Sequence, residues 1–104
     1  MELRPIFVID PSKMLLSLYV PIEVGATWEQ ASELSFALCV INDALPDGHF
    51  CFDRRNMSVY FKMTSSFYDS IVSESVVEYM LSVAAEKAEE YCPKIRELTD
   101  VRRV

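Results

Sequence analysis

Apolar and polar residues alternate with a period of two in four stretches of the chain, and this pattern predicts β-strands. Two of them, residues 3–10 and 14–22, are separated by the turn signal Asp10-Pro11-Ser12-Lys13. The other two, residues 49–53 and 57–63, flank a short turn. The pattern therefore predicts two antiparallel hairpins. Met14, Leu16, Leu18 and Val20 share one face of their strand, and Phe50, Phe52, Val59 and Phe61 are expected to face the core.

Two longer stretches have the three-and-four spacing of amphipathic helices. The first is expected over residues 27–45, because Thr27 and Gln30 form a capping-box pattern. The second begins at about Ser73, and Pro93 is expected to kink or end it near Glu89, with a frayed tail beyond. The predicted core stripes are Trp28, Ala31, Leu34, Leu38, Ile41 and Leu45 in the first helix, and Val77, Leu81, Ala84, Ala88, Tyr91, Ile95 and Leu98 in the second.

The order of these elements is β-β-α-β-β-α, which predicts an α+β fold. We expect a two-layer sandwich, with an antiparallel sheet and the helices on one of its faces. The 104 residues suffice for one domain, residues 1–104, and 51% of them are apolar. A folded core is therefore expected rather than disorder.

The predicted helix 27–45 carries more apolar residues than one sheet can cover. Phe36, Ala37 and Val40 lie away from its core stripe, and an exposed apolar patch usually marks an interface. The first strand, with Ile6 and Val8, offers a second surface, because an edge strand can pair its backbone with another chain. We therefore expect a homodimer that uses these five residues, since a two-fold arrangement is the commonest closed assembly.

Charge and cysteine content narrow the classes of partner and compartment. The formal charge is −6 without a clustered basic stripe, so we expect no nucleic-acid partner. Three widely spaced cysteines form neither a disulfide framework nor a zinc motif, and free thiols suit the cytoplasm. No signal peptide and no apolar run of membrane-spanning length is recognised, so we expect no membrane association.

The sharpest candidate for chemistry is the set His49, Cys51 and Asp53, which share one face of a predicted strand. They could bind a metal or a small ligand, or form a Cys-His pair. Alternate residues along a straight strand stand about 7 Å apart, too far for a direct hydrogen bond. We therefore favour a solvated polar face, assign no catalytic, cofactor or metal residue, and expect no enzyme. A small ligand- or metal-binding domain remains the alternative.

The joint between helix 27–45 and the second hairpin carries a family resemblance. Asn42, Leu45, Gly48 and Phe50, followed by a strand, a turn and another strand, resemble the pattern of the YbjN family. The stretch PIFVIDPSKMLLSLYVPI is similar to the paired strands of that family. The stretch VVEYMLSVAAEKAEEYCPKI is similar to its closing helix with a Tyr-x-Pro ending.

The resemblance implies a bacterial sensory transduction regulator with a fold similar to that of type III secretion chaperones. It implies a protein-binding role without catalysis, and small, acidic, dimeric relatives. The helix and strand with which such proteins usually begin have no counterpart before Leu3. Asn42, Gly48 and Phe50 are expected to be structural: an amide that bonds backbone groups, a residue with positive φ, and a ring that packs under the helix.

Overall fold

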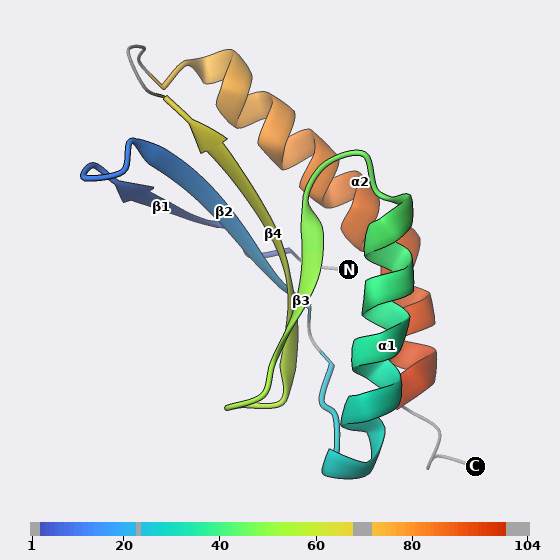
Figure 1. The fold of residues 1–104 in the computed structure, drawn as a ribbon. Helices are drawn as coiled ribbons and strands as arrows, with labels where there is room; N and C mark the ends of the chain where they lie inside the picture. Colours follow the sequence, from blue (N-terminus) through green and yellow to red (C-terminus); the bar gives the residue numbers. More distant parts are fainter. Residues whose placement is uncertain (1–2, 23, 68–71, 100–104) are drawn as a thin grey trace.

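The computed structural model describes residues 3–22, 24–67 and 72–99 (Figure 1). The elements follow the predicted order. They are the strands β1 (Ile6–Asp10) and β2 (Leu15–Ile22), the helix α1 (Trp28–Ala44), the strands β3 (His49–Asp53) and β4 (Ser58–Ser66), and the helix α2 (Glu74–Thr99). Compared with the prediction, β4 begins one residue later and ends three residues later, because Thr64, Ser65 and Ser66 still pair with β2. The predicted frayed tail lies outside the described residues beyond Thr99.

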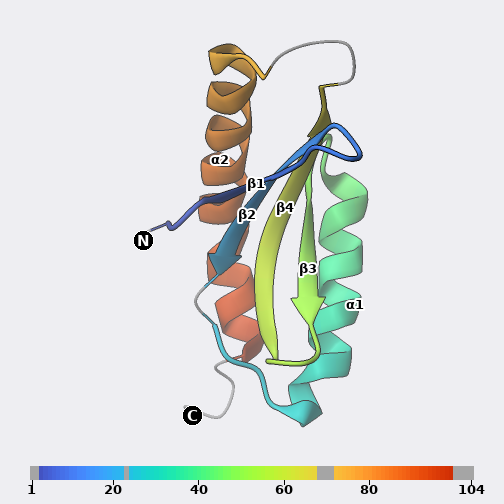
Figure 2. The same ribbon diagram turned by 90° about the vertical axis from the view of Figure 1, so that its left-hand side faces the viewer.

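The four strands form one antiparallel sheet in the order β1-β2-β4-β3. Both helices lie on the same face, with α1 beside β3 and α2 across β2 and β4 (Figures 1 and 2). The opposite face of the sheet is not covered by any described element. The predicted two-layer α+β architecture is thus confirmed, and β1 and β3 are the two edges of the sheet.

The two hairpins are closed by loops of the same design. Each begins with an aspartate whose carboxylate accepts a backbone N–H two residues later, from Ser12 to Asp10 and from Arg55 to Asp53. Each loop ends with a methionine in the left-handed region, with φ of 55° and 54°. In each turn the aspartate carboxylate accepts a hydrogen bond from the backbone, as a backbone carbonyl would in a standard turn. The two hairpins therefore share one loop geometry although their sequences differ.

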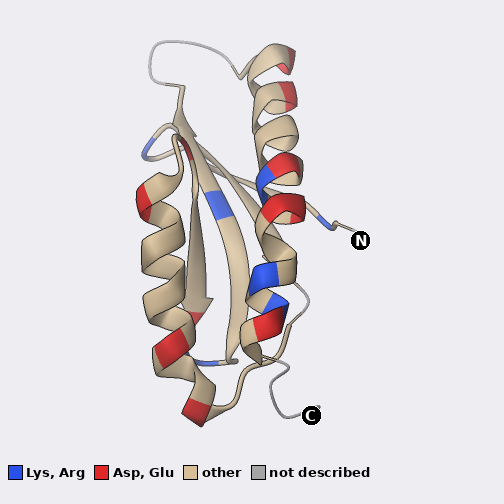
Figure 3. Ribbon diagram, turned by 90° about the vertical axis from the view of Figure 1, so that its right-hand side faces the viewer, with Lys and Arg blue, Asp and Glu red and all other residues tan. Residues whose placement is uncertain are grey.

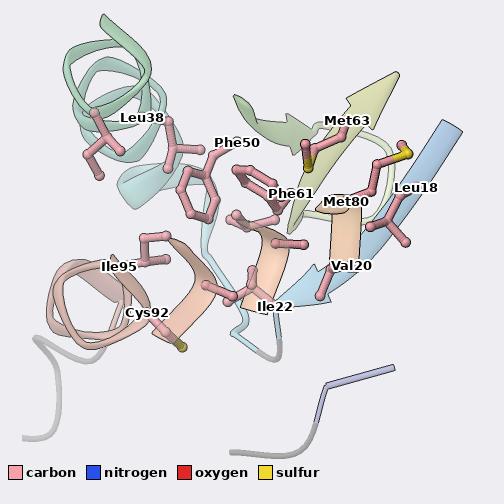
Figure 4. Packing of buried hydrophobic residues seen from close by; sticks show 14 of the residues in the cluster. Leu18, Val20, Ile22, Leu38, Phe50, Phe61, Met63, Met80, Cys92 and Ile95 are labelled. Carbon is pink, nitrogen blue, oxygen red and sulfur yellow. The ribbon is translucent and has the colours of Figure 1, made fainter. Parts of the chain in front are cut away.

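The core lies between the sheet and the two helices (Figure 4). Phe61 is fully buried at its centre, and the ring of Phe50 meets it edge-on with the ring centroids 5.0 Å apart. Tyr91 packs against the other side of Phe50 at 5.9 Å. Such edge-to-face contacts stabilise a core beyond the area that they bury. The predicted core positions Leu34, Leu38, Ile41, Phe50, Val59, Phe61, Ala84, Ala88 and Ile95 are all buried, and so are Leu16, Leu18 and Val20 on one face of β2.

The prediction that Trp28 faces the core is wrong, since 69% of its surface is exposed. The capping box of Thr27 and Gln30 forms as expected, so the helix start itself was predicted correctly. The stripe runs from residue 28 through 31 to 34 in two steps of three. Each such step falls 60° short of a full turn, so Trp28 lies well to the side of Leu34. Phe52, also predicted in the core, is only half-buried near this end.

The buried face of α2 matches the predicted stripe only at Ala84, Ala88 and Ile95. Its other buried residues are Met80, Cys92 and Thr99, whereas Val77, Tyr91 and Leu98 are partly buried. Met80 is buried, whereas Leu81 is 36% exposed, because neighbouring residues of a helix lie about 100° apart around its axis and the buried face runs through Met80 and Ala84. The helix also continues through Pro93 to Thr99 and does not end near Glu89. Pro93 is on the exposed side of the helix, where water can bond the carbonyl that lacks a donor.

The joint between α1 and β3 works as the sequence predicts. Asn42 donates from its Nδ2 to the carbonyl of Phe50 (2.9 Å) and accepts the N–H of Phe50 at its Oδ1 (2.7 Å). One side chain thereby satisfies both backbone groups that Phe50 turns away from β4. Gly48 has a φ of 74°, which lets the chain leave the helix and enter the strand. The β3 edge of the sheet is therefore closed at Phe50 by an amide from α1.

Replacing Asn42 with alanine should lower the free energy of unfolding by about 1–3 kcal/mol, because both backbone groups of the buried Phe50 lose their partner. Urea denaturation measures this change. Asn56→Ala is a matched control, since Asn56 lies in an exposed turn and should change stability by less than about 0.5 kcal/mol. Equal effects of the two variants would show that the Asn42 amide has no special structural role.

Candidate functional site

Two apolar surfaces lie on different parts of the fold, and they contain the five residues predicted at an interface. The first is the exposed side of α1, where Phe36 is 72% exposed and Val40 is also exposed. Ala37 is half-buried beside them. Between α1 and α2 these residues line a shallow groove of about 320 Å³, which we call the outer groove. Its lining consists of Glu33, Phe36, Ala37, Val40, Ile41, Lys94, Glu97 and Leu98.

The outer groove has an apolar floor and a rim that is more acidic than basic. Glu33 and Glu97 lie on the rim with one cation, Lys94. Most of the acidic side chains on the described elements are carried by the two helices (Figure 3). A segment that fits this groove would present apolar residues to its floor and basic residues to its rim. The sequence pattern identified the α1 side of the groove but missed Lys94 and Leu98, which depend on how α2 packs beside α1.

The second surface is β1, an edge strand that is exposed on both faces. The exposed fractions of Ile6, Phe7, Val8 and Ile9 lie between 37% and 56%. The pairing of β1 with β2 places Ile6 and Val8 on the uncovered face of the sheet, opposite Tyr19 and Ser17. Phe7 and Ile9 point to the helix side, where α2 does not reach across to cover them (Figure 2). The prediction named Ile6 and Val8, and in the structure their neighbours Phe7 and Ile9 are exposed as well.

His49, Cys51 and Asp53 lie on the uncovered face of the sheet, as their alternation predicts. Asp53 accepts the backbone N–H of Arg55 and lies 3.5 Å from its side chain, so it has a structural role in the turn. Within residues 3–22, 24–67 and 72–99, no group of three His, Cys, Asp or Glu side chains could hold a metal ion. The geometry therefore adds nothing to the metal-site alternative.

The rest of this face is built from long polar side chains that lie along the sheet. Tyr19 and Tyr60 are neighbours with ring centroids 5.8 Å apart, and the ammonium group of Lys62 lies 5.2 Å above the Tyr19 ring. The hydrogen bond with Cys51, together with partial burial, raises the pKa of Tyr60 above its usual value. These contacts cover the sheet with amphipathic side chains, and they satisfy one another instead of converging on a ligand.

A smaller hollow of about 240 Å³ lies where α1 ends and α2 begins. There the hydroxyl of Tyr79 donates to Asp47 at 2.9 Å, and this bond raises the pKa of Tyr79. The bond joins the α1–β3 joint to the first turns of α2. Both side chains take part in the contact between α2 and the α1–β3 joint. The hollow is therefore better explained as a gap between these packed elements than as a ligand site.

The helices in the described part of the chain include none with the length and apolar character needed to cross a membrane. All three cysteines are free, with Cys39 exposed, Cys51 half-buried and Cys92 buried.

Comparison of the chain with protein-family models, with curated proteins and with solved structures gave no match.

Proposed function

We propose that this chain is a non-enzymatic protein-interaction module with a chaperone-like or regulatory role. It forms a homodimer and binds a further protein. One observation carries the proposal: large apolar side chains are exposed on two separate surfaces, the outer groove and β1. Monomeric soluble proteins rarely leave contiguous apolar patches in water, and such patches usually mark protein contacts. The three free thiols support a cytoplasmic location, because disulfides form in oxidising compartments.

The outer groove is the proposed site for the further protein. Its apolar floor fits the apolar face of a helix or a short apolar segment, and its acidic rim favours flanking basic residues. The same rim disfavours a second copy of this chain, whose helices also carry most of its acidic side chains. The resemblance to the YbjN family and to secretion chaperones is consistent with a protein partner but says nothing of its identity.

Affinity capture from native cell extract tests this function with a pair of matched variants. Phe36→Glu should reduce the captured partner at least about tenfold, because it places a charge among the apolar side chains that line the groove. Trp28→Glu should leave capture unchanged, since Trp28 is as exposed as Phe36 and lies on the same helix but outside the groove. Circular dichroism confirms that both variants are folded. Capture that survives Phe36→Glu, or that is lost equally in both variants, would contradict the proposed site.

A further inference from the structure

The pairing of β2 with β4 determines in which direction each residue of β1 points its backbone N–H and C=O groups. In an antiparallel pair, hydrogen-bonded residue pairs alternate with pairs that are not bonded. The N–H of Phe67 donates to the carbonyl of Met14 at 2.9 Å, directly before the pairing of Leu15 with Ser66. The even-numbered residues of β2 therefore direct their backbone groups to β4, and the odd-numbered residues direct theirs to β1.

The odd-numbered β2 residues Leu15, Ser17 and Tyr19 pair with Asp10, Val8 and Ile6. These three β1 residues therefore direct their backbone groups into the sheet. Phe7 and Ile9 direct theirs outward, and the described residues contain no partner strand on that side. The same alternation explains why Phe50 turns its groups to Asn42 at the other edge. The β3 edge of the sheet is thus closed at Phe50 by a side-chain amide. The β1 edge, which no further described strand adjoins, is the open edge.

The open edge lacks the usual features that prevent pairing. Natural edge strands carry charges, prolines or bulges that block a second chain. In β1 the four residues from Ile6 to Ile9 are all apolar, and the strand pairs with β2 without a bulge. Asp10 is the only charged residue of the strand, and its carboxylate is occupied by Ser12 and Lys13 in the turn. Like-charge repulsion between two copies is therefore weaker here than at the acidic helices.

We infer that β1 pairs antiparallel with β1 of a second copy, so that two four-stranded sheets join into one of eight strands. This inference rests on the self-association in the proposed function and names its surface. Phe7 then lies opposite Ile9 of the second copy. The N–H groups of Phe7 and Ile9 in the two copies, four in total, all donate to outward carbonyls of the other copy. Val8 then lies on the two-fold axis, opposite its own copy. Pro5 and Pro11 meet at each end of the paired segment, where they stop the pairing because proline has no N–H to donate.

An alternative register, with Phe7 opposite Phe7, satisfies the donors less completely. It places the carbonyl of Ile9 opposite Pro5, which cannot donate a hydrogen bond. Pairing of Phe7 with Ile9 also brings apolar side chains together on the helix side of the joined sheet. A second copy therefore complements this edge in its hydrogen bonds and its apolar surface.

Sedimentation velocity across concentration tests the inference with three variants. Val8→Lys should raise the dimer dissociation constant about 100-fold or more, because two lysines would face each other on the axis. Val8→Thr keeps a branched side chain of similar size and should change the constant less than about tenfold. Phe36→Lys, on the outer groove, should leave it unchanged. Loss of dimer in Phe36→Lys but not in Val8→Lys would overturn the inference.

Amide exchange measured by NMR gives a second test at the same residues. In the wild type, exchange of the Phe7 and Ile9 amides should slow as the protein concentration rises. Exchange of the Ile6 and Val8 amides should already be slow in dilute samples, because these groups bond to β2. Fast exchange at Phe7 and Ile9 at all concentrations would contradict the pairing. A monomer that still captures its partner through the outer groove would overturn this inference and leave the proposed function standing.

Discussion

Replacing Phe50 with alanine is expected to lower the free energy of unfolding by about 3–5 kcal/mol. The ring is 2% exposed, and it contacts Phe61 on one side and Tyr91 on the other. Truncation would leave a cavity between the sheet and both helices, and the helices are joined to the sheet at this point. Urea denaturation followed by circular dichroism gives the change directly.

Phe36→Ala is the matched control for this prediction. It removes the same ring from α1, where 72% of its surface is exposed, so stability should change by less than about 0.5 kcal/mol in dilute monomer. A loss below about 1 kcal/mol in Phe50→Ala would mean that the two faces of β3 are assigned the wrong way round.

Gly48→Ala should cost about 2–5 kcal/mol, the second large effect that we expect. The φ of 74° costs an alanine about 1–2 kcal/mol. The added Cβ would overlap a ring carbon of Phe61 and lie 2.9 Å from the Cγ of Met63. Both side chains are buried, and overpacking of a core adds about 1–3 kcal/mol.

Gly25→Ala separates this effect from the general behaviour of glycine. A Cβ at Gly25 meets nothing within 4 Å, and the substitution restricts the unfolded chain. We expect it to leave stability unchanged or to raise it by up to about 1 kcal/mol. Thermal denaturation of the two variants side by side measures the difference. Similar melting temperatures would show that the α1–β3 joint tolerates a side chain at Gly48.

The sequence predicts the order of elements well because each element has a strong local signal. Alternation fixes the strand faces, and the capping box at Thr27 fixes the start of α1. The errors occur where tertiary contacts decide. Trp28 and Leu81 are apolar residues at helical spacing, but the buried faces of the two helices are centred on other residues, so both side chains stay exposed. Pro93 forbids one hydrogen bond, yet the buried residues Cys92, Ile95 and Thr99 keep the helix intact on both sides.

The candidate surfaces could be predicted only in part. An excess of apolar residues on α1 indicates that Phe36 and Val40 are exposed, because a helix has only one face toward its sheet. The opposite outcomes at the two sheet edges could not be predicted from alternation alone. They depend on which strand is outermost and on which backbone groups point outward. Asn42 reaches one of these edges, and no strand in the described part of the chain pairs with the other.

Sedimentation equilibrium of the wild-type protein between about 1 and 100 µM tests the central claim, that this chain is a self-associating interaction module. The chain has a mass of 11.9 kDa. We predict that the weight-average mass rises with concentration and approaches twice this value. A mass that stays at 11.9 kDa across the whole range would contradict self-association and leave the exposed β1 edge without the partner that we assign to it.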